Sequence, residues 1–194
     1  MSVTLISAPD AKPTTSADPI LRAHLRLEAD ETEQDELIDS FIGLATRRIE
    51  NFTRQRLITQ TMRLNLNGFG RCGIEIPIWP VQSIAQVTYV DSAWDTQTLD
   101  ASDYRLIDSE MPNELHPAYG SSWPVTRDDL GSVKIDVIAG YGDAGADLPD
   151  ELMGALRLLV AHYFLHREAF FAGGSVEEIP HGVTDMLREL VFWV

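Results

Sequence analysis

The 194-residue sequence contains a single cysteine, Cys72, and few basic residues. One cysteine cannot form an intrachain disulfide, which fits a reducing compartment, and a lone thiol is more often a small core side chain than a nucleophile. The first residues, MSVTLISAPDAKPTT, lack a basic segment followed by an apolar one, so we predict no signal peptide. The longest apolar segment, Leu152 to Leu165, is too short for a bilayer and carries Arg157 and His162. We therefore predict a buried helix there, in a soluble protein of cytoplasmic origin.

The scarcity of bases limits the possible partners. Fifteen Lys and Arg against 30 Asp and Glu give a formal net charge of -15. Such a surface repels nucleic-acid phosphates and anionic membranes, so we expect neither sequence-specific DNA binding nor membrane docking. DNA that only passes nearby is compatible with it, because a channel through which DNA slides should not hold it. The alternative interpretation is that the acidity only keeps the protein soluble.

The motifs of the common enzyme classes are also missing. No serine lies in GxSxG, and no GxxxxGK[ST] is present. His162 and His166 have a zinc-binding spacing, but Tyr163 stands where zincins have Glu, and no third ligand lies at a telling spacing. Asp and Glu are so abundant that two of them close together do not indicate a general acid–base pair. We predict no catalytic, cofactor-binding or metal-binding residues and expect a protein that is not an enzyme.

Three glycines of GYGDAG, Gly140 to Gly145, fit the bare dinucleotide-binding pattern GxGxxG. Their context does not fit it, because they follow the last predicted strand and precede a helix that begins with Pro149, Asp150 and Glu151. Acids at that helix start repel a pyrophosphate. We interpret these glycines as turn residues.

Helical patterns occupy both ends of the chain. We predict helices over 18–25, with Pro19 in the first turn, over 33–54, and over 149–171, where Asp147 could cap the start. A short helix is predicted at about 183–190. The second helix carries an apolar stripe with a period near 3.6 residues: Ile38, Phe41, Ile42, Ala45, Ile49 and Phe52. The third is apolar nearly all round, so it should be buried.

Between these helices the apolar period changes to two, which predicts strands in a β region over 57–139. Pro77 inside one of them suggests a sheet edge. We expect 96–99 and 104–107 to form a hairpin and 112–126 to be irregular. The other predicted strands are 58–66, 74–78, 84–90 and 133–139. Helices that flank a central antiparallel β region indicate an α+β fold, with a helical bundle formed by the N- and C-terminal helices and the sheet as an insertion.

Charge is unevenly distributed along the second predicted helix. Seven acids and no base lie between Glu28 and Asp39, and arginines gather at the far end. The pattern matches the helix dipole, which is the simpler explanation. The alternative is that copies of the chain meet with unlike ends in contact, or that the acids face a lumen. The candidate residues for such a lumen or subunit interface are Glu31, Asp35, Asp39, Arg47, Arg48, Arg54 and Arg56.

The chain ends in VFWV, whereas chain ends are usually polar. Such a terminus must be buried in its own core or in a partner. The candidate docking residues are Phe170, Phe171, Phe192, Trp193 and Val194.

The order of these segments resembles the head-to-tail connector (adaptor) proteins of tailed bacteriophages and of phage-derived gene transfer agents. The resemblance runs through LRAHLRLEADETEQDELIDSFIGLATRRIENFTRQRLITQT, IEIPIWPVQSIAQVTYVD, TQTLDASDYRL, ELHPAYGSSWP, VKIDVIAGYGDAGADLPDELMGALRLLVAHYFLHREA and IPHGVTDML. On the basis of this resemblance, we divide the chain into an N-terminal arm (1–16), a connector domain (17–171) and a C-terminal tail with a short helix (172–194).

The resemblance implies a structural role without cofactors. Such connectors form a ring beneath the portal, of twelve copies by the portal's symmetry, which extends the DNA channel and carries stopper or tail components. The implied partners are the portal, a stopper or tail-side connector protein and the chain itself, in a particle assembled in the bacterial cytoplasm. Two alternatives stay open at this point: a soluble enzyme with an unrecognised carboxylate site, and a protein-binding module without a role in a particle.

Overall fold

The computed structural model of the chain describes residues 1–70, 73–108, 112–166 and 181–191. These residues form two compact units, each with its own core. The helical unit comprises Ala11–Ile58 and the described residues from Gly142 onward, and the β unit comprises Met1–Asp10 and Thr59–Tyr141. Helices and antiparallel sheets are thus segregated, which confirms the α+β class.

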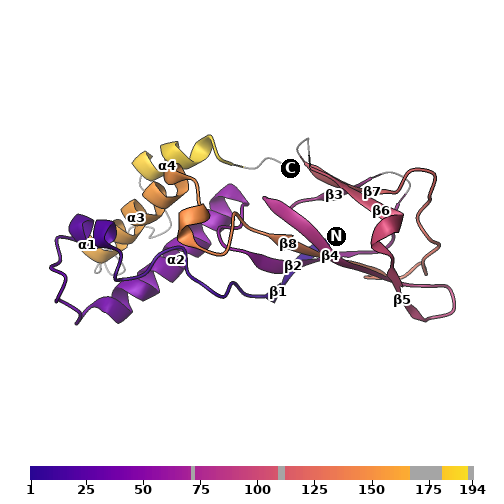
Figure 1. Ribbon diagram of the computed structural model, residues 1–194, viewed down its shortest axis with the longest axis horizontal. Helices are drawn as coiled ribbons and strands as arrows, with labels where there is room; N and C mark the ends of the chain where they lie inside the picture. The colour runs from indigo at the N-terminus through magenta and orange to yellow at the C-terminus, as the bar shows by residue number, and fades with distance from the viewer. Residues whose placement is uncertain (71–72, 109–111, 167–180, 192–194) are drawn as a thin grey trace, which may run out of the picture. The chain divides into compact units, whose positions relative to one another are not determined.

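The helical unit contains α1 (Pro19–Leu25), α2 (Asp35–Thr53), α3 (Asp150–Leu165) and α4 (His181–Arg188). The long helix α3 packs against the other three (Figure 1). Four residues of the predicted stripe on α2 are fully buried, namely Ile38, Ile42, Ala45 and Ile49. None of the helices in the described ranges is long and apolar enough to cross a membrane.

Helix α3 is less completely buried than its composition predicts. Leu152, Leu156 and Leu159 are fully buried, whereas Leu158 is 36% exposed and Leu165 is 72% exposed. The expectation of burial all round was therefore wrong for one side of the helix. Helix α3 ends at Leu165, with His166 as the residue that follows it, so the predicted helix was too long at this position; 167–171 lie outside the described residues.

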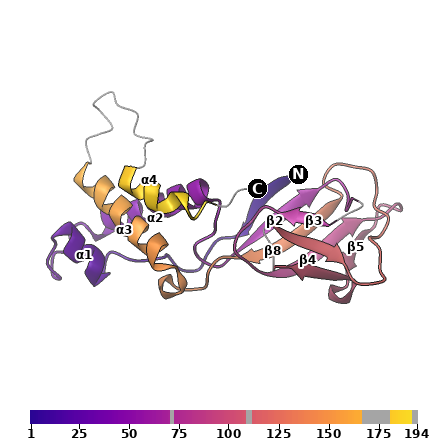
Figure 2. The same cartoon turned by 90° about the horizontal axis from the view of Figure 1, so that it is seen from above.

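The β unit consists of two antiparallel sheets. The five-stranded sheet has the order β1 (Ser2–Ser7), β2 (Gln60–Leu66), β8 (Val133–Ala139), β4 (Val81–Val90), β5 (Thr96–Leu99). The three-stranded sheet has the order β3 (Ile74–Ile76), β7 (Asn113–Pro117), β6 (Tyr104–Ile107). The smaller sheet lies over the larger one (Figures 1 and 2). Their apolar faces share one core, which includes Leu64 and Ile135 from the larger sheet and Ile76 and Leu115 from the smaller. Side chains alternate between buried and exposed along β8, as a period of two requires.

Strand pairing departs from the sequence predictions in three places. The predicted hairpin of 96–99 and 104–107 was wrong, because β5 pairs with β4 while β6 pairs with β7 in the other sheet. Part of the segment predicted as irregular, 112–126, forms β7. Within the predicted arm 1–16, Ser2–Ser7 pairs with β2 at the sheet edge. Short strands are misassigned in this way because their partners lie far away in the sequence. The prediction from Pro77 was correct: the adjoining β3 is an edge strand.

The start of α3 also differs from its prediction. Pro149 is the residue before the helix, and the Asp147 carboxylate instead accepts a hydrogen bond of 3.0 Å from the Ala144 amide in the preceding 3-10 turn. Asp147 is therefore not the cap of α3, although Asp150 and Glu151 do lie in its first turn.

Candidate functional site

Arg22 on α1 organises the chain between α1 and α2. Arg22 is only 7% exposed, and each of the five N–H groups of its guanidinium has an acceptor. Nε donates to the Glu28 carbonyl at 3.2 Å, and Nη2 donates to the carbonyls of Glu28 and Glu31 at 2.6 and 2.7 Å. Nη1 donates to the Ser16 carbonyl at 3.2 Å and to Asp35 Oδ1 at 2.9 Å. One buried guanidinium thus ties the backbone at Glu28 and Glu31 to Asp35 at the start of α2.

The backbone turns sharply where this segment begins. Arg26 adopts a left-handed conformation with φ of 60°, and the amides of Arg26 and Leu27 donate back to carbonyls of α1. This is how helices commonly end. The Glu28 amide then donates to the Glu31 carboxylate at 2.8 Å, which closes a turn of the segment on itself.

The acids predicted for a lumen or subunit interface are largely engaged within the chain. Asp35 pairs with Arg22, and Asp39 pairs with Lys12 at 3.3 Å and accepts the Ser16 amide at 2.9 Å. Glu31 accepts the Glu28 amide and offers its own carbonyl to Arg22. These three carboxylates therefore stabilise the fold of the chain itself, which the sequence pattern did not reveal.

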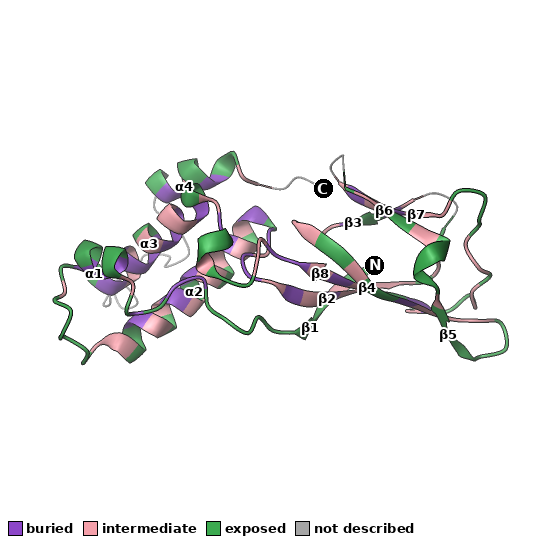
Figure 3. Ribbon diagram, in the orientation of Figure 1, coloured by how far each residue is buried: buried purple, intermediate pink, exposed green. Residues whose placement is uncertain are grey.

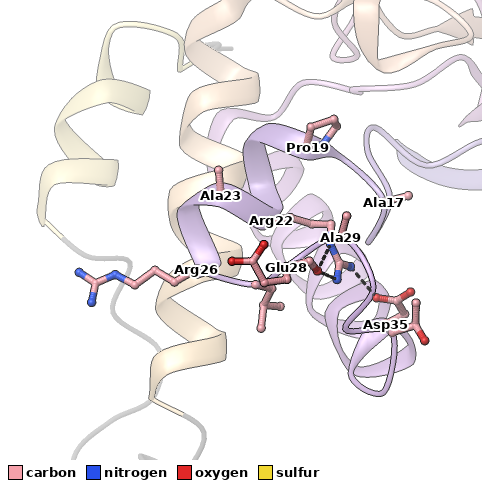
Figure 4. Close-up of a pocket in the computed structure, with 10 residues that line it drawn as sticks. Ala17, Pro19, Arg22, Ala23, Arg26, Glu28, Ala29 and Asp35 are labelled. Atoms are coloured by element: carbon pink, nitrogen blue, oxygen red, sulfur yellow. Dashed lines mark hydrogen bonds and ion pairs between the residues drawn. The ribbon is translucent and has the colours of Figure 1, made fainter.

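A hollow of about 610 Å³ lies beside this cluster, between the end of α1 and the start of α2 (Figure 4). Pro19, Ala23 and Ala29 give it small apolar walls, and Arg22 and Asp35 lie at one side of it. The Arg26 guanidinium points away from these two side chains (Figure 4). Because every N–H of Arg22 already has an acceptor within the chain, the hollow has no free guanidinium donor from Arg22 for an anionic ligand.

Asp18 joins α1 to α3. Its Oδ1 caps α1 by accepting the amides of Ile20 and Leu21 at 2.9 and 3.3 Å. Its Oδ2 accepts Thr14 Oγ1 at 2.8 Å and the Arg157 guanidinium at 2.9 and 2.7 Å. Burial by itself raises the pKa of the Asp18 carboxyl, but the hydrogen bonds from Thr14, Arg157 and the two amides outweigh it and leave the pKa below its usual value.

The candidate arginines at the other end of α2 differ in their environments. Arg56 lies 3.7 Å from the Glu50 carboxylate and is largely buried. Arg48 lies near Tyr163 on α3 and acts on it electrostatically. Arg47 and Arg54 are exposed, and neither forms an ion pair with any described residue. The structure thus separates four arginines that look equivalent in the sequence.

The candidate docking residues Phe170, Phe171, Phe192, Trp193 and Val194 lie outside the described residues. Their role stays a prediction. Nearby, α4 belongs to the core of the helical unit, because Val183 is 3% exposed and Leu187 is fully buried. The Gln55 side chain also donates to the Leu190 carbonyl.

The histidine pair His162 and His166 and the glycines of GYGDAG are the described features that the sequence offered for metal or nucleotide binding. The rings of His162 and His166 lie 4.7 Å apart, and the pKa of His162 is lowered by burial and further by His166. Within the described part of the chain, no group of three or more His, Cys, Asp or Glu side chains could hold a metal ion. In GYGDAG, a Cβ at Gly145 would fall 1.7 Å from the Pro13 carbonyl oxygen, and one at Gly142 would meet the Asp147 carboxylate. Close approach of the chain explains these two glycines.

Comparisons with known proteins point to particle components. No protein-family model matches the chain, and no curated protein matches it. Among solved structures, it is similar to a chain in the neck of an empty GTA particle computed with C6 symmetry, with 28% identity and a TM-score of 0.77. It is also similar to chains in the virion of a native gene transfer agent (GTA) particle, at 27% and 0.76, and in the neck of a native GTA particle computed with C12 symmetry, at 26% and 0.75. Each match covers 100% of this chain and 97% of the other. These likenesses support a neck-associated protein of a GTA or phage particle.

Sequence reasoning missed Arg22, Asp18 and Arg157 as organising residues. Asp18 immediately before Pro19 is a recognisable helix start, and Arg157 stood out as a base within an apolar segment. Arg22 carried no signal, because most of its acceptors are backbone carbonyls, which every residue possesses.

We expect Arg22→Lys to lower the free energy of unfolding by about 2–4 kcal/mol, because an ammonium with three donors leaves buried carbonyls and Asp35 without partners. Chemical denaturation followed by circular dichroism measures the change. Arg26→Lys is the matched control, since Arg26 is exposed on the same segment. Equal stability of the two variants would contradict the role given to Arg22.

We expect Asp18→Asn to lower the free energy of unfolding by about 1–3 kcal/mol near neutral pH, because it keeps a capping oxygen but loses the charge that pairs with Arg157. The folded pKa of Asp18 is lowered, so its contribution is fully present above the unfolded value of about 3.9 and is lost as the pH falls through the folded pKa. The difference between wild type and variant should therefore shrink below about pH 4. Exposed Asp30→Asn serves as the control, and a difference that grows in acid would refute the assignment.

Proposed function

We propose that the chain is a structural adaptor subunit that forms a ring beneath the portal of a phage-like particle and joins the capsid vertex to stopper or tail components. The observation that carries this proposal is similarity along the whole chain, at 26–28% identity, to chains of GTA necks. One of those necks was computed with C12 symmetry, which supports twelve copies in the ring. The proposed role requires assembly and no catalysis.

The fold suits a subunit of this kind. Two compact units with separate cores offer several faces for contacts with unlike neighbours. Head-to-tail contacts close into a ring when the rotation per subunit divides the circle. In this proposal the four packed helices are the helical bundle of the connector domain, the β unit is its insertion, and the subunits assemble in the bacterial cytoplasm.

The charge suits a channel through which DNA slides. With a net charge of -15, the ring repels phosphates on average, so DNA passes without sequence-specific binding. The lumen or subunit interface that we predicted, from Glu31 to Arg56, is part of the proposal. Asp35, Asp39 and Arg56 form ion pairs within the chain and therefore stabilise its fold. Arg47 and Arg54 are the exposed arginines of the predicted set.

Purified DNA-filled particles should contain this subunit at the head-tail junction. Deletion of its gene should leave heads without tails, filled or leaking, because the portal would lack the platform on which tail components assemble. Electron microscopy of particles from the deletion strain measures this outcome, and expression of the chain from a plasmid should restore tails. Normal tailed particles from the deletion strain would refute the adaptor role.

The proposed portal-docking residues at the end of the chain can be tested by substitution. Since Val183 and Leu187 are buried, truncation before α4 would damage the helical unit, and the change must be confined to the end of the chain. We expect Phe192→Ala with Trp193→Ala to weaken binding to purified portal by about tenfold or more, as loss of aromatic anchors does. Cosedimentation measures binding. Trp94→Ala, which removes a 66% exposed tryptophan in the β unit, is the control, and unchanged binding of the double variant would refute this docking site.

A further inference from the structure

One side of α2 faces solvent along most of its length. It consists of Glu33 just before the helix and of Glu36, Leu37, Ser40, Leu44 and Arg47, which we call the outward face of α2. The spacings of three and four residues place all six on the side opposite the buried Ile38, Ile42 and Ile49. Figure 3 shows this alternation of buried and exposed positions along α2. Leu37 is 36% exposed and Leu44 is 42% exposed.

The charges of this face are not used within the chain. Asp35 and Asp39, which neighbour Glu36 and Ser40 in the sequence, form internal ion pairs. Glu33, Glu36 and Arg47 form no ion pair with any described residue, and Arg47 Nε donates a long hydrogen bond of 3.4 Å to the Gly43 carbonyl of its own helix. The helix dipole does not account for Arg47, because the last turn of α2 contains no base. The outward face is therefore acidic at one end, apolar in the middle and basic at the other end.

We infer that the free protein uses this face to bind a second copy of itself, with the two α2 helices antiparallel about a two-fold axis near Ser40. A parallel pair in register would place like charges opposite each other. In the antiparallel pair, Leu37 of one copy lies level with Leu44 of the other. Arg47 then lies level with the turn between Glu33 and Glu36 of the partner, on both sides of the axis. The small Ser40 lies at the crossing point, where two helices approach most closely.

This contact belongs to the free protein and is distinct from the proposed ring, on which it does not depend. Neighbours in a ring of twelve are related by a rotation of about 30° about one axis, so their α2 helices cannot be antiparallel. A contact between ring neighbours therefore cannot have this antiparallel geometry. Pairing in solution would hold subunits in reserve until the portal offers a stronger contact.

Sedimentation equilibrium of the full chain tests the pairing. We expect a monomer–dimer equilibrium that weakens as salt is raised, because ion pairs at the surface are screened. Arg47→Glu should weaken it by about tenfold or more, since two attractions become two repulsions, and Glu36→Arg together with Arg47→Glu should restore it. Arg54→Glu is the matched control: it makes the same charge change at an exposed arginine that follows the last residue of α2 and lies level with a position before the partner helix begins. A monomer at all concentrations, or equal effects of Arg47→Glu and Arg54→Glu, would overturn the proposal.

Cysteine crosslinking separates the antiparallel pair from a parallel one. In a chain with Cys72→Ser, Ser40→Cys should form a disulfide-linked dimer under mild oxidation, because position 40 lies beside its own copy across the axis. Asn51→Cys should not, because its two copies lie about 30 Å apart along the antiparallel helices. Crosslinking of both variants would indicate a parallel pair, and crosslinking of neither would overturn the proposal. Both results concern the free chain, so the particle experiments remain an independent test of the adaptor role.

Discussion

The helical unit depends on one buried guanidinium. Arg22 donates all five of its N–H groups to acceptors on three stretches of chain: Ser16 ahead of α1, Glu28 and Glu31 after it, and Asp35 in the first turn of α2. The segment from Glu28 to Asp39 carries seven carboxylates and no base; Arg22 pairs with one of them, Asp35, and Lys12 with another, Asp39. The backbone carbonyls of Glu28 and Glu31 supply most of the acceptors, so the arrangement resists changes of side chain in the segment better than loss of the arginine.

A second set of ionic contacts holds the start of the same helix, α1. Asp18 caps α1 and also accepts the guanidinium of Arg157 on α3, a residue that the chain reaches only after the whole β unit. The order of elements makes such ties necessary. The chain leaves the helical unit after Ile58 and returns at Gly142, so α1 and α2 must be joined to α3 and α4 by contacts between segments distant in sequence.

In the proposed adaptor role, these internal pairs decide which charges remain available to partners. The chain carries a net charge of -15, yet several of its acids and bases are already paired inside the helical unit. What remains outside is ordered along α2: acids at its start, leucines in its middle, arginines toward its end. Electrostatic complementarity of this kind sets orientation and register more than affinity, which is what a protein needs when copies of it must meet in one geometry.

The sequence by itself determined the fold class, the positions of the four helices within a few residues, the strands with strong alternation such as β8, and the edge position of β3. These features follow from local periods and from proline, which act within one segment. It also determined the resemblance to head-to-tail connector proteins, since that rests on the order of segments. Only the tertiary structure decided that β5 and β6 belong to different sheets, that Arg22 is buried, and that Asp35 and Asp39 are paired while Glu36 and Arg47 face outward. The physical reason is the same in each case: strand pairing, burial and ion pairing depend on partners far along the chain, and neighbouring charges in a sequence look alike until the fold turns them to different sides.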